Sequence, residues 1–401
     1  MKIVDVAEFY SDQGGGVKTY INSKLEAGAK HGHEIVIIAP GPESGEEERN
    51  GGRVIWVKSP TMPFDNRYYL LWRKKEVFRI LDKENPDIVE GSSPWTGGYF
   101  VSKWKGNALK TFVFHVDPVA VYPQTFLGNL MSFSKIDSFF GFFWRYLQML
   151  SNRYDATIVS GKWLAHRLEK FNLNNPVSVP FGIDKDFFSP KRRDPELRSR
   201  FLNELNLNQD ASLFICVSRY HPEKRLSTII DGFKKISQKH NAGLLIFGDG
   251  PLRKWIQQKA KDVNHLKLMG FTSNRDELAN AMASSDYYVH GSSAETFGLV
   301  VAEAICSGLP IVVPKTGGAV DLSDSSYSEV YKTGNEQDLS DAMEKIIERN
   351  YSQMKAACKR AAENKIYSVD EHFQNLFACY KKLLSEKNSS YKDTSSTTVA
   401  T

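Results

Sequence analysis

Short runs of apolar and β-branched residues alternate with longer stretches of mixed polarity along almost the whole chain. In the first half these runs predict strands at 2–9, 33–40, 52–59, 87–93, 111–117, 156–160 and 177–182. In the second half they predict strands at 213–219, 243–250, 266–270, 287–292 and 310–315. Continuous apolar strands separated by amphipathic helices are typical of parallel sheets that helices cover on both faces. The pattern therefore predicts an α/β protein with two doubly wound domains in series.

The domain boundary is predicted near "FGIDKDFFSPKRRDPE", where a strand ends and prolines flank a charged run. This divides the chain into a first domain at 1–188 and a second at 189–366. Helices are expected at 336–348 and 352–386, with a break near Tyr367. We expect the last segment, 367–386, to pack back toward the N-terminal domain. The polar, Ser/Thr-rich tail at 387–401 is expected to be disordered.

Composition places the chain among soluble globular proteins, with 25% charged and 41% hydrophobic residues in 401. No stretch approaches the roughly 18 apolar residues of a spanning helix, and the first residues lack the pattern of a signal peptide. The four cysteines lie far apart, so reduced thiols and a cytoplasmic location are expected. The net charge of +5 suits an anionic ligand or acidic lipid and is too small for a dedicated nucleic-acid binder.

A glycine-rich segment, "SDQGGGVKTY", follows the first predicted strand. Gly14, Gly15 and Gly16 would let the backbone approach a ligand, and a helix starting near Val17 would offer free N–H groups. The segment is not a dinucleotide fingerprint, because Thr19 stands where the third glycine would be. A phosphate or sugar hydroxyl is the expected ligand, and a turn without a ligand is the alternative.

A second candidate is "VSRYHPEKRL", where Arg219 leaves a strand and Lys224 is predicted to begin a helix. Two cations beside a helix N-terminus are unfavourable unless an anion joins them, and a diphosphate fits. Solvated charges, partly neutralised by Glu223, are the alternative. A third segment, "FGDGPLRK", places Gly250 in a strand-to-helix turn that could be structural or could contact the ligand.

Two glutamates carry the fourth candidate, "AETFGLVVAEAICSGLPIVVPKTGG". Glu295 lies in a loop after a strand, and Glu303 lies one to two turns into the following helix. Helical side chains lean toward the N-terminus, so both acids could face one ligand, with the amides of Phe297–Leu299 between them. Carboxylates accept hydrogen bonds from neighbouring hydroxyls, which favours a ribose or hexose. Two outward-facing acids are the alternative.

In the first domain, "FHVDP" ends a strand with His115. A histidine at a strand end is often structural. Ligands of doubly wound domains bind at the carboxyl ends of the strands, however, so this position also makes His115 a candidate for catalysis.

These pieces, in this order, resemble the retaining GT-B glycosyltransferases of the group-one class, family four. The strongest elements are Glu295 and Glu303 with Phe297–Gly298, "SGLPIVVPKTGG", "SRYHPEK" and "GDGPLR". Two departures from the family pattern are Phe181, where an Asn is usual, and Arg225, where a Gly often follows the lysine. The resemblance implies two Rossmann-like domains facing a cleft, the first binding the acceptor and the second the nucleotide sugar. It covers almost the whole ordered chain.

The resemblance also implies a role for each matching residue. Arg219 and Lys224 would bind the donor diphosphate and stabilise the leaving nucleotide. Glu303 would hold the ribose hydroxyls, Glu295 would contact the donor hexose, and His115 would sit beside the transferred sugar. Amides of Phe297, Gly298 and Leu299 would meet the sugar or phosphate. The glycines Gly15, Gly16 and Gly250 complete the expected donor site, and the family needs no metal or other cofactor.

The chemistry implied is transfer with retention of configuration. The charge that develops on the leaving diphosphate would be met by Arg219 and Lys224. Since no residue is an obvious covalent nucleophile, a front-face substitution is favoured, in which the leaving phosphate takes the acceptor proton. A UDP-sugar is the favoured donor, with UDP-glucose or UDP-glucuronate before GDP-mannose.

The acceptor is predicted from two basic or aromatic segments. "DNRYYLLWRKKEVFRI", from Asp65, is expected to form a basic-aromatic helix suited to an anionic lipid surface. "SFFGFFWRYLQMLSNRY", from Ser138, could line a groove for acyl chains or enter the membrane interface. We therefore expect a peripheral enzyme on the inner face of the cytoplasmic membrane, acting on a lipid such as diacylglycerol. Ordinary core helices with basic residues at the surface are the alternative.

Three other functions compete with this prediction. A lipopolysaccharide or exopolysaccharide glycosyltransferase would use a glycan acceptor. A nucleotide-sugar epimerase would turn over donor without acceptor. A binding module without catalysis would bind the nucleotide sugar and leave it intact.

Overall fold

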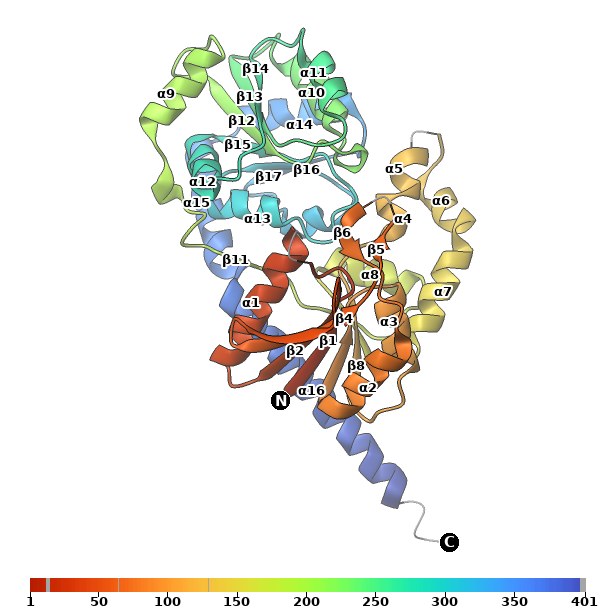
Figure 1. The fold of residues 1–401 in the computed structure, drawn as a ribbon. Helices are drawn as coiled ribbons and strands as arrows, with labels where there is room; N and C mark the ends of the chain where they lie inside the picture. The colour runs from red at the N-terminus through yellow and green to blue at the C-terminus, as the bar shows by residue number, and fades with distance from the viewer. Residues whose placement is uncertain (12–14, 64, 129, 397–401) are drawn as a thin grey trace. The chain divides into compact units, whose positions relative to one another are not determined.

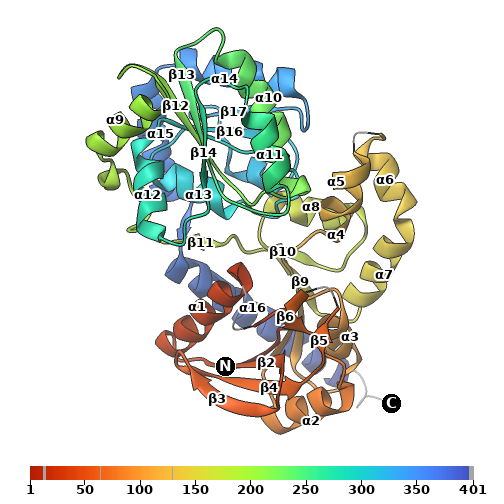
Figure 2. The ribbon, with the colours of Figure 1, turned by 45° about the horizontal axis from the view of Figure 1, so that its top comes forward.

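The computed structural model describes residues 1–11, 15–63, 65–128 and 130–396, which form two compact units. The first unit contains residues 1–115, 140–180 and the C-terminal segment from 369. The second contains 116–139 and 181–368. Both are α/β units with parallel sheets (Figures 1 and 2).

The first unit is built on an eight-stranded sheet in the order β10-β9-β8-β7-β1-β2-β4-β3. All neighbours pair in parallel except the edge strand β3, which joins β4 in antiparallel fashion. The strands are β1 Lys2–Val6, β2 Glu34–Gly41, β3 Gly45–Arg49, β4 Gly52–Lys58, β7 Ile88–Gly91, β8 Leu109–Phe114, β9 Ala156–Val159 and β10 Pro176–Ser178. The principal helices of this unit are α1 Gly16–Lys30, α2 Lys74–Glu84, α3 Thr96–Lys103, α7 Gly141–Ser151, α8 Lys162–Lys170 and α16 Val369–Ser396.

The second unit has a six-stranded parallel sheet in the order β14-β13-β12-β15-β16-β17. Its strands are β12 Ser212–Val217, β13 Ala242–Phe247, β14 Leu266–Gly270, β15 Tyr287–Val289, β16 Ile311–Pro314 and β17 Ser328–Tyr331. Its helices are α4 Pro118–Val121, α5 Pro123–Leu127, α6 Phe133–Phe139, α9 Pro195–Glu204, α10 Leu226–Ile236, α11 Arg253–Ala260, α12 Arg275–Ser284, α13 Leu299–Cys306, α14 Glu336–Glu348 and α15 Tyr351–Asn364.

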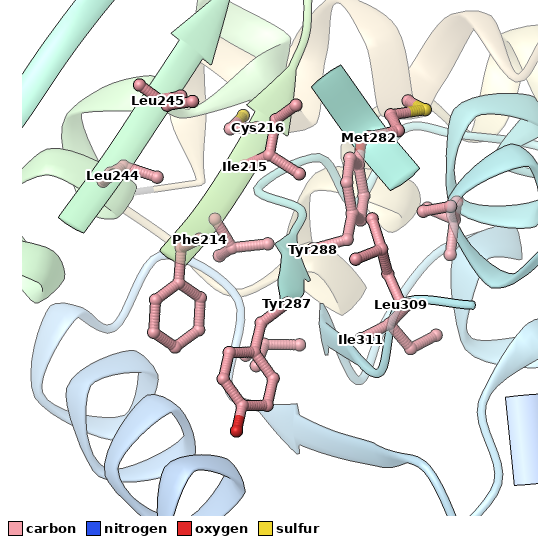
Figure 3. Close-up of a cluster of buried hydrophobic side chains, with 14 of the residues drawn as sticks. Phe214, Ile215, Cys216, Leu244, Leu245, Met282, Tyr287, Tyr288, Leu309 and Ile311 are labelled. Atoms are coloured by element: carbon pink, nitrogen blue, oxygen red, sulfur yellow. The ribbon is translucent and has the colours of Figure 1, made fainter. Parts of the chain in front are cut away.

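Buried side chains from the central strands fill the core of the second unit. Figure 3 shows Phe214, Tyr287 and Tyr288 from β12 and β15, packed with apolar residues of β13, α12 and β16. The strands are apolar along their length because helices cover both faces of the sheet. The packed sheet therefore gives rigid support to the loops that follow the carboxyl ends of its strands.

Three expectations from the sequence need correction. Residues Asp65–Tyr69 form strand β6, which pairs with β5 Thr61–Met62, so the predicted basic-aromatic helix starts only at Lys74. The two aromatic residues of 65–69, Tyr68 and Tyr69, favour an extended chain. Helix α16 continues to Ser396, so the predicted disordered tail from 387 is helical over its described part.

The third correction concerns the division of the chain. The first predicted domain, 1–188, is interrupted, because 116–139 packs in the second unit. The chain also enters the second unit at Phe181 and leaves it after Ser368, where β11 Gly182–Ile183 pairs with β18 Tyr367–Ser368. These two short strands hold together the entry and exit of the second unit.

Candidate functional site

The loop after β12 carries the two predicted cations. Arg219 is exposed just beyond the strand, whereas Lys224 ends a short 3-10 turn, Pro222–Lys224. The predicted helix does not begin at Lys224. Arg225 adopts a left-handed conformation with φ +49°, and α10 starts after it at Leu226. This sharp bend turns the chain between Lys224 and the helix.

Two glycines of the segment after β13 fit closely against this loop. A Cβ on Gly248 would lie 1.8 Å from the carbonyl oxygen of Ser218. One on Gly250 would lie 2.7 Å from that of Tyr220. Tyr220 in turn donates its backbone N–H to Asp249 O at 2.8 Å. The packing of the two loops is enough to explain why a glycine is present at position 250. A direct contact of Gly250 with a ligand stays a prediction.

Lys224 and Glu295 are brought together by the loop after β15. The Lys224 ammonium donates to Glu295 Oε1 at 2.5 Å, and a second carboxylate, that of Glu223, lies 3.6 Å away. A Cβ on Gly291 would meet the carbonyl oxygen of Lys224 at 2.4 Å, so only glycine lets the two loops approach this closely. The carboxyl ends of the adjacent strands β12 and β15 thus place a cation against an acid.

The electrostatics of this pair follow from its partly buried position. Burial lowers the pKa of Lys224, but the charges of Glu295 and Glu223 outweigh it, so that the pKa is raised. Burial raises the pKa of Glu295, yet the positive charge of Lys224 and its hydrogen bond bring that pKa below its ordinary value. Both groups are therefore ionised at neutral pH. The Lys224 ammonium keeps donors beyond the one that Glu295 accepts.

The second predicted acid, Glu303, lies within α13. Burial raises its pKa to about 7, while the charge of Arg275 acts in the opposite direction. The charges of Glu295 and Glu303 both raise the pKa of the buried Tyr288 phenol, although burial contributes more. The two acids thus act electrostatically on one side chain of β15, and that they face one ligand stays a prediction.

The residues between the two acids form the start of α13. Gly298 is its N-cap, in a left-handed conformation with φ +94°, and no side chain caps the helix. Leu299, the first helical residue, is exposed, whereas the Phe297 ring is buried and contacts Phe181 edge to face at 5.7 Å. Any contact that Phe297 makes with a ligand would therefore come from its backbone.

A second glycine turn supports the Glu295 loop from behind. Gly318 donates its backbone N–H to Glu295 O at 2.6 Å. A Cβ on Gly318 would lie 2.1 Å from Thr296 O, and one on Gly317 would lie 2.6 Å from Ser293 O. The glycine pair that follows β16 is thus needed for this close packing, and it fixes the backbone on both sides of Glu295.

The first unit holds the remaining predicted residues. Gly14 lies outside the described residues. Gly15 precedes α1 and Gly16 begins it, and an added Cβ at either would meet nothing described within 4 Å. Neither glycine is therefore required by the packing of the described chain, which leaves space for a ligand. Near the end of β8, His115 contacts Tyr20 edge to face at 5.3 Å. Burial lowers the His115 pKa to about 3, so its imidazole is neutral.

An ionic cluster in this unit was missed by the sequence analysis. The fully buried Lys24 of α1 donates to Asp5 Oδ2 at 2.9 Å and also to Glu90, and Tyr380 of α16 donates to Glu90 Oε1 at 2.9 Å. Burial raises the pKa of Glu90 to about 7. A signal was present in the sequence, because Asp5 and Glu90 interrupt apolar strands. The cluster ties α1 and α16 to adjacent strands of the sheet.

His290 of the second unit was also missed. It follows β15 directly, is buried, and its Nε2 has no hydrogen-bond partner among the described residues. Burial lowers its pKa to about 4, against the opposing charge of Glu295 and a hydrogen bond with the backbone of Ser292. A neutral histidine thus lies within the electrostatic reach of Glu295 and Lys224.

A fold of two Rossmann-like units with this loop chemistry defines the GT-B glycosyltransferases. Two family profiles cover most of the chain: "Glycosyltransferase Family 4" matches residues 14–187 and "Glycosyl transferases group 1" matches residues 198–365. The chain belongs to the group 1, family 4 glycosyltransferases, and this confirms the resemblance found in the sequence.

Individual relatives agree with this assignment. A GDP-mannose-dependent alpha-mannosyltransferase of Mycobacterium tuberculosis (strain CDC 1551) is 30% identical over 329 residues, covering 80% of this chain and 81% of the relative. A GDP-mannose-dependent alpha-(1-6)-phosphatidylinositol dimannoside mannosyltransferase of the same species (strain H37Ra) is 24% identical over 365 residues, covering 90% and 92%. The structure of sucrose-phosphate synthase from Thermosynechococcus elongatus superposes with a TM-score of 0.74 at 16% identity, covering 96% of this chain and 99% of that one.

Proposed function

We propose that this glycosyltransferase moves a hexose or hexuronic acid from a nucleotide-diphosphate sugar to a membrane lipid, with retention of configuration and without a metal. The observation that carries the donor part is the contact of Lys224 with Glu295 at the carboxyl ends of β12 and β15, with Glu303 acting on the same Tyr288 side chain as Glu295. It combines a cation for the diphosphate with acids for sugar hydroxyls.

The proposed mechanism assigns each group a charge-related task. Lys224 and the exposed Arg219 bind the diphosphate and stabilise the negative charge that grows on it as the anomeric C–O bond breaks. These two cations supply the positive charge that a metal would otherwise provide. The leaving phosphate oxygen takes the proton of the acceptor hydroxyl, which attacks from the same face. The neutral His115 imidazole contacts the transferred sugar. The backbone amides of Gly15 and Gly16 contact the phosphates.

The base of the donor is the least constrained part of the proposal. The sequence analysis favoured a UDP-sugar, whereas both relatives described above are named as GDP-mannose-dependent. The proposed contacts of Lys224, Glu295 and Glu303 involve the diphosphate, hexose and ribose, which both donors share. The donor class is therefore a nucleoside diphosphate hexose, and UDP-sugars and GDP-mannose are the two donors to compare.

A lipid acceptor is supported by the relative whose name specifies phosphatidylinositol dimannoside. It also agrees with the mild positive net charge of +5. Among the described residues, no helix has the length and apolarity needed to cross a membrane. We accordingly propose peripheral association with the inner face of the cytoplasmic membrane. Lipopolysaccharide or exopolysaccharide synthesis on a glycan acceptor remains the alternative.

Mass spectrometry of lipids tests the proposal directly. Purified protein is incubated with anionic lipid vesicles containing diacylglycerol or phosphatidylinositol and with UDP-glucose, UDP-glucuronate or GDP-mannose in separate reactions. We expect one donor to yield a glycosylated lipid. Lys224→Ala should abolish the product, and Lys234→Ala, which removes an exposed lysine of α10, should not.

Other products would identify the competing functions. Elongation of a soluble glycan with no glycolipid would support the polysaccharide alternative. Conversion of the donor to an isomer without acceptor would indicate an epimerase. Saturable donor binding with no reaction of any kind would indicate a binding module without catalysis.

A further inference from the structure

Segment 116–139 of the second unit exposes an unusual number of large apolar side chains. Leu130 is 82% exposed, Phe126 61% and Tyr122 58%, and Met131 is also exposed. The backbone connects them as successive turns, since Phe126 N–H donates to Tyr122 O at 3.2 Å and Met131 N–H donates to Leu127 O at 3.0 Å. Tyr122 and Phe126 are four residues apart and so lie on one side of the chain.

The buried side of this segment includes polar as well as apolar side chains. Gln124, between the two exposed aromatic residues, donates its side-chain amide to Asp137 Oδ1 of α6 at 2.9 Å, and both side chains are buried. Helices α5 and α6 lie side by side in both views (Figures 1 and 2). The segment therefore buries the polar Gln124 and Asp137 together with apolar residues such as Val119 and Ile136, while other large apolar side chains face solvent. Such an arrangement indicates a binding surface rather than a core.

Arg225 joins segment 116–139 to the rest of the second unit. Its guanidinium donates to the backbone oxygen of Gln124 at 3.3 Å and lies 6.0 Å from the ring centre of Phe133. Arg225 directly follows Lys224, the proposed diphosphate ligand. The exposed apolar surface is thus carried by the unit that is proposed to bind the donor.

The charges of the segment favour an anionic partner. Its charged residues are Asp117, Lys135 and Asp137. Both aspartates are buried and hydrogen-bonded, Asp117 to the backbone of Val119 and Ala120, whereas Lys135 is exposed. Exposed charge on this segment is therefore positive only. Apolar side chains with a basic residue between them suit the interface of an anionic bilayer.

We propose that Tyr122, Phe126, Leu130, Met131 and Lys135 form a docking surface for an anionic lipid bilayer. The inference rests on the proposed function, in which the acceptor is a membrane lipid, and it names the surface that meets the membrane. The apolar side chains enter the headgroup region, and Lys135 pairs with lipid phosphates. The basic helix predicted from Asp65, which is shortened in the structure to Lys74–Glu84, is not needed for this contact.

Sedimentation with vesicles of phosphatidylcholine and phosphatidylglycerol tests the surface. The variant Phe126→Ser/Leu130→Ser should lower the partition coefficient by about tenfold or more, because two large apolar side chains no longer enter the bilayer. Lys135→Glu should weaken binding to the anionic vesicles and leave the weaker binding to pure phosphatidylcholine unchanged. The matched control is Trp255→Ser, which removes an exposed aromatic residue of α11 and should bind as the unaltered chain does.

The result that would overturn the inference is equal sedimentation of the double variant and the unaltered chain. A concentration-dependent dimer that the double variant abolishes would also overturn it, since the surface would then join two copies. Transfer to a lipid dispersed in detergent micelles is measured in parallel. Retained transfer in micelles with lost vesicle binding supports the docking surface. Failure of all variants to glycosylate lipid in micelles would instead count against the proposed function.

Discussion

The contact between Lys224 and Glu295 makes each residue the counterion of the other within a partly buried site. Glu295→Gln should therefore lower the free energy of unfolding by roughly 1–3 kcal/mol, because the ammonium loses its charged partner. Lys224→Met should have a similar cost, and the double variant should recover much of it. Denaturant unfolding of the three variants measures the coupling.

Activity should not follow stability in this series. If Lys224 binds the diphosphate, transfer should stay lost in the double variant even where stability returns. A double variant that regained both stability and transfer would show that the pair is only structural.

Glu303 should give the donor site a dependence on pH. Burial raises its pKa to about 7, so it is partly protonated at neutral pH. A carboxylate accepts more hydrogen bonds from ribose hydroxyls than a carboxylic acid does, and the donor should therefore favour the ionised form. Donor affinity should rise from about pH 6 to about pH 8 and then level off. Calorimetry at several pH values measures this rise.

The matched variant is Glu303→Gln, which has nearly the same shape and no ionisation. Its affinity for the donor should be lower by about tenfold at high pH and independent of pH over the same range. An identical rise with pH in Glu303→Gln would assign the titration to another group.

At this scale, residues with a distinctive sequence context could be singled out as candidates, and their roles stay predictions. Glu295 and Glu303 stand out because acids seldom begin and interrupt an apolar helix, and the structure places both near Tyr288. His290 was missed although it follows an apolar strand, as His115 does. Its significance depends on burial beside Glu295 and Lys224, which belong to other loops.

Turns that contain glycine bring the loops of the site together. For two glycines, Gly318 and Gly16, substitution by alanine is predicted to have opposite effects on stability. Gly318→Ala should lower the free energy of unfolding by roughly 1–3 kcal/mol and reduce transfer, because its Cβ would overlap Thr296 O and displace the Glu295 loop. Gly16→Ala should keep or slightly raise the melting temperature, since its Cβ has space and alanine favours a helix.

Donor binding separates the roles of these glycines. Gly16→Ala should raise KM for the donor by several-fold if the phosphates approach the backbone there. Steady-state kinetics and thermal melting of both variants give the comparison. An unchanged KM in Gly16→Ala would remove this glycine from the site.

Elements with a clear periodicity were predicted well, and those set by tertiary contacts were not. The twelve predicted strands each overlap a strand of the two sheets, and α14 spans Glu336–Glu348 as expected. Strand β3 was missed because its sequence, "GEEER", is polar, and it forms the edge of the sheet through pairing with β4. The turn at Arg225 was missed for a similar reason, since nothing local in the sequence requires a left-handed residue there.

On the scale of the whole molecule, the position of a segment along the chain does not always predict the unit in which it packs. Residues 116–139 are flanked on both sides by segments of the first unit and yet pack in the second. The contacts that hold them there, from Arg225 to Gln124 and Phe133, join residues about a hundred positions apart, beyond what a local pattern can show. Composition can suggest two domains, but only packing assigns each segment to one of them.

The C-terminal helix is essential to the first unit although it is last in the chain. Phe373, Leu376, Phe377 and Tyr380 are buried in the core of that unit, and Tyr380 also donates to Glu90 of the ionic cluster. Each such side chain contributes on the order of 1.5–3 kcal/mol through burial. A chain ending at Ser368 should therefore lose the cooperative unfolding of the first unit.

A chain ending at Asn388 supplies the control for this truncation. It keeps the buried aromatic residues and the contact of Lys387 with Asp155 at 2.9 Å, so its melting temperature should stay within about 2 °C of the full chain. Circular dichroism during heating and limited proteolysis compare the two. If the chain ending at Ser368 still unfolded cooperatively with a protected first unit, helix α16 would be an accessory to that core. If the chain ending at Asn388 were also unstable, the stabilising contacts would lie in the helical part beyond it, which the sequence predicted to be disordered.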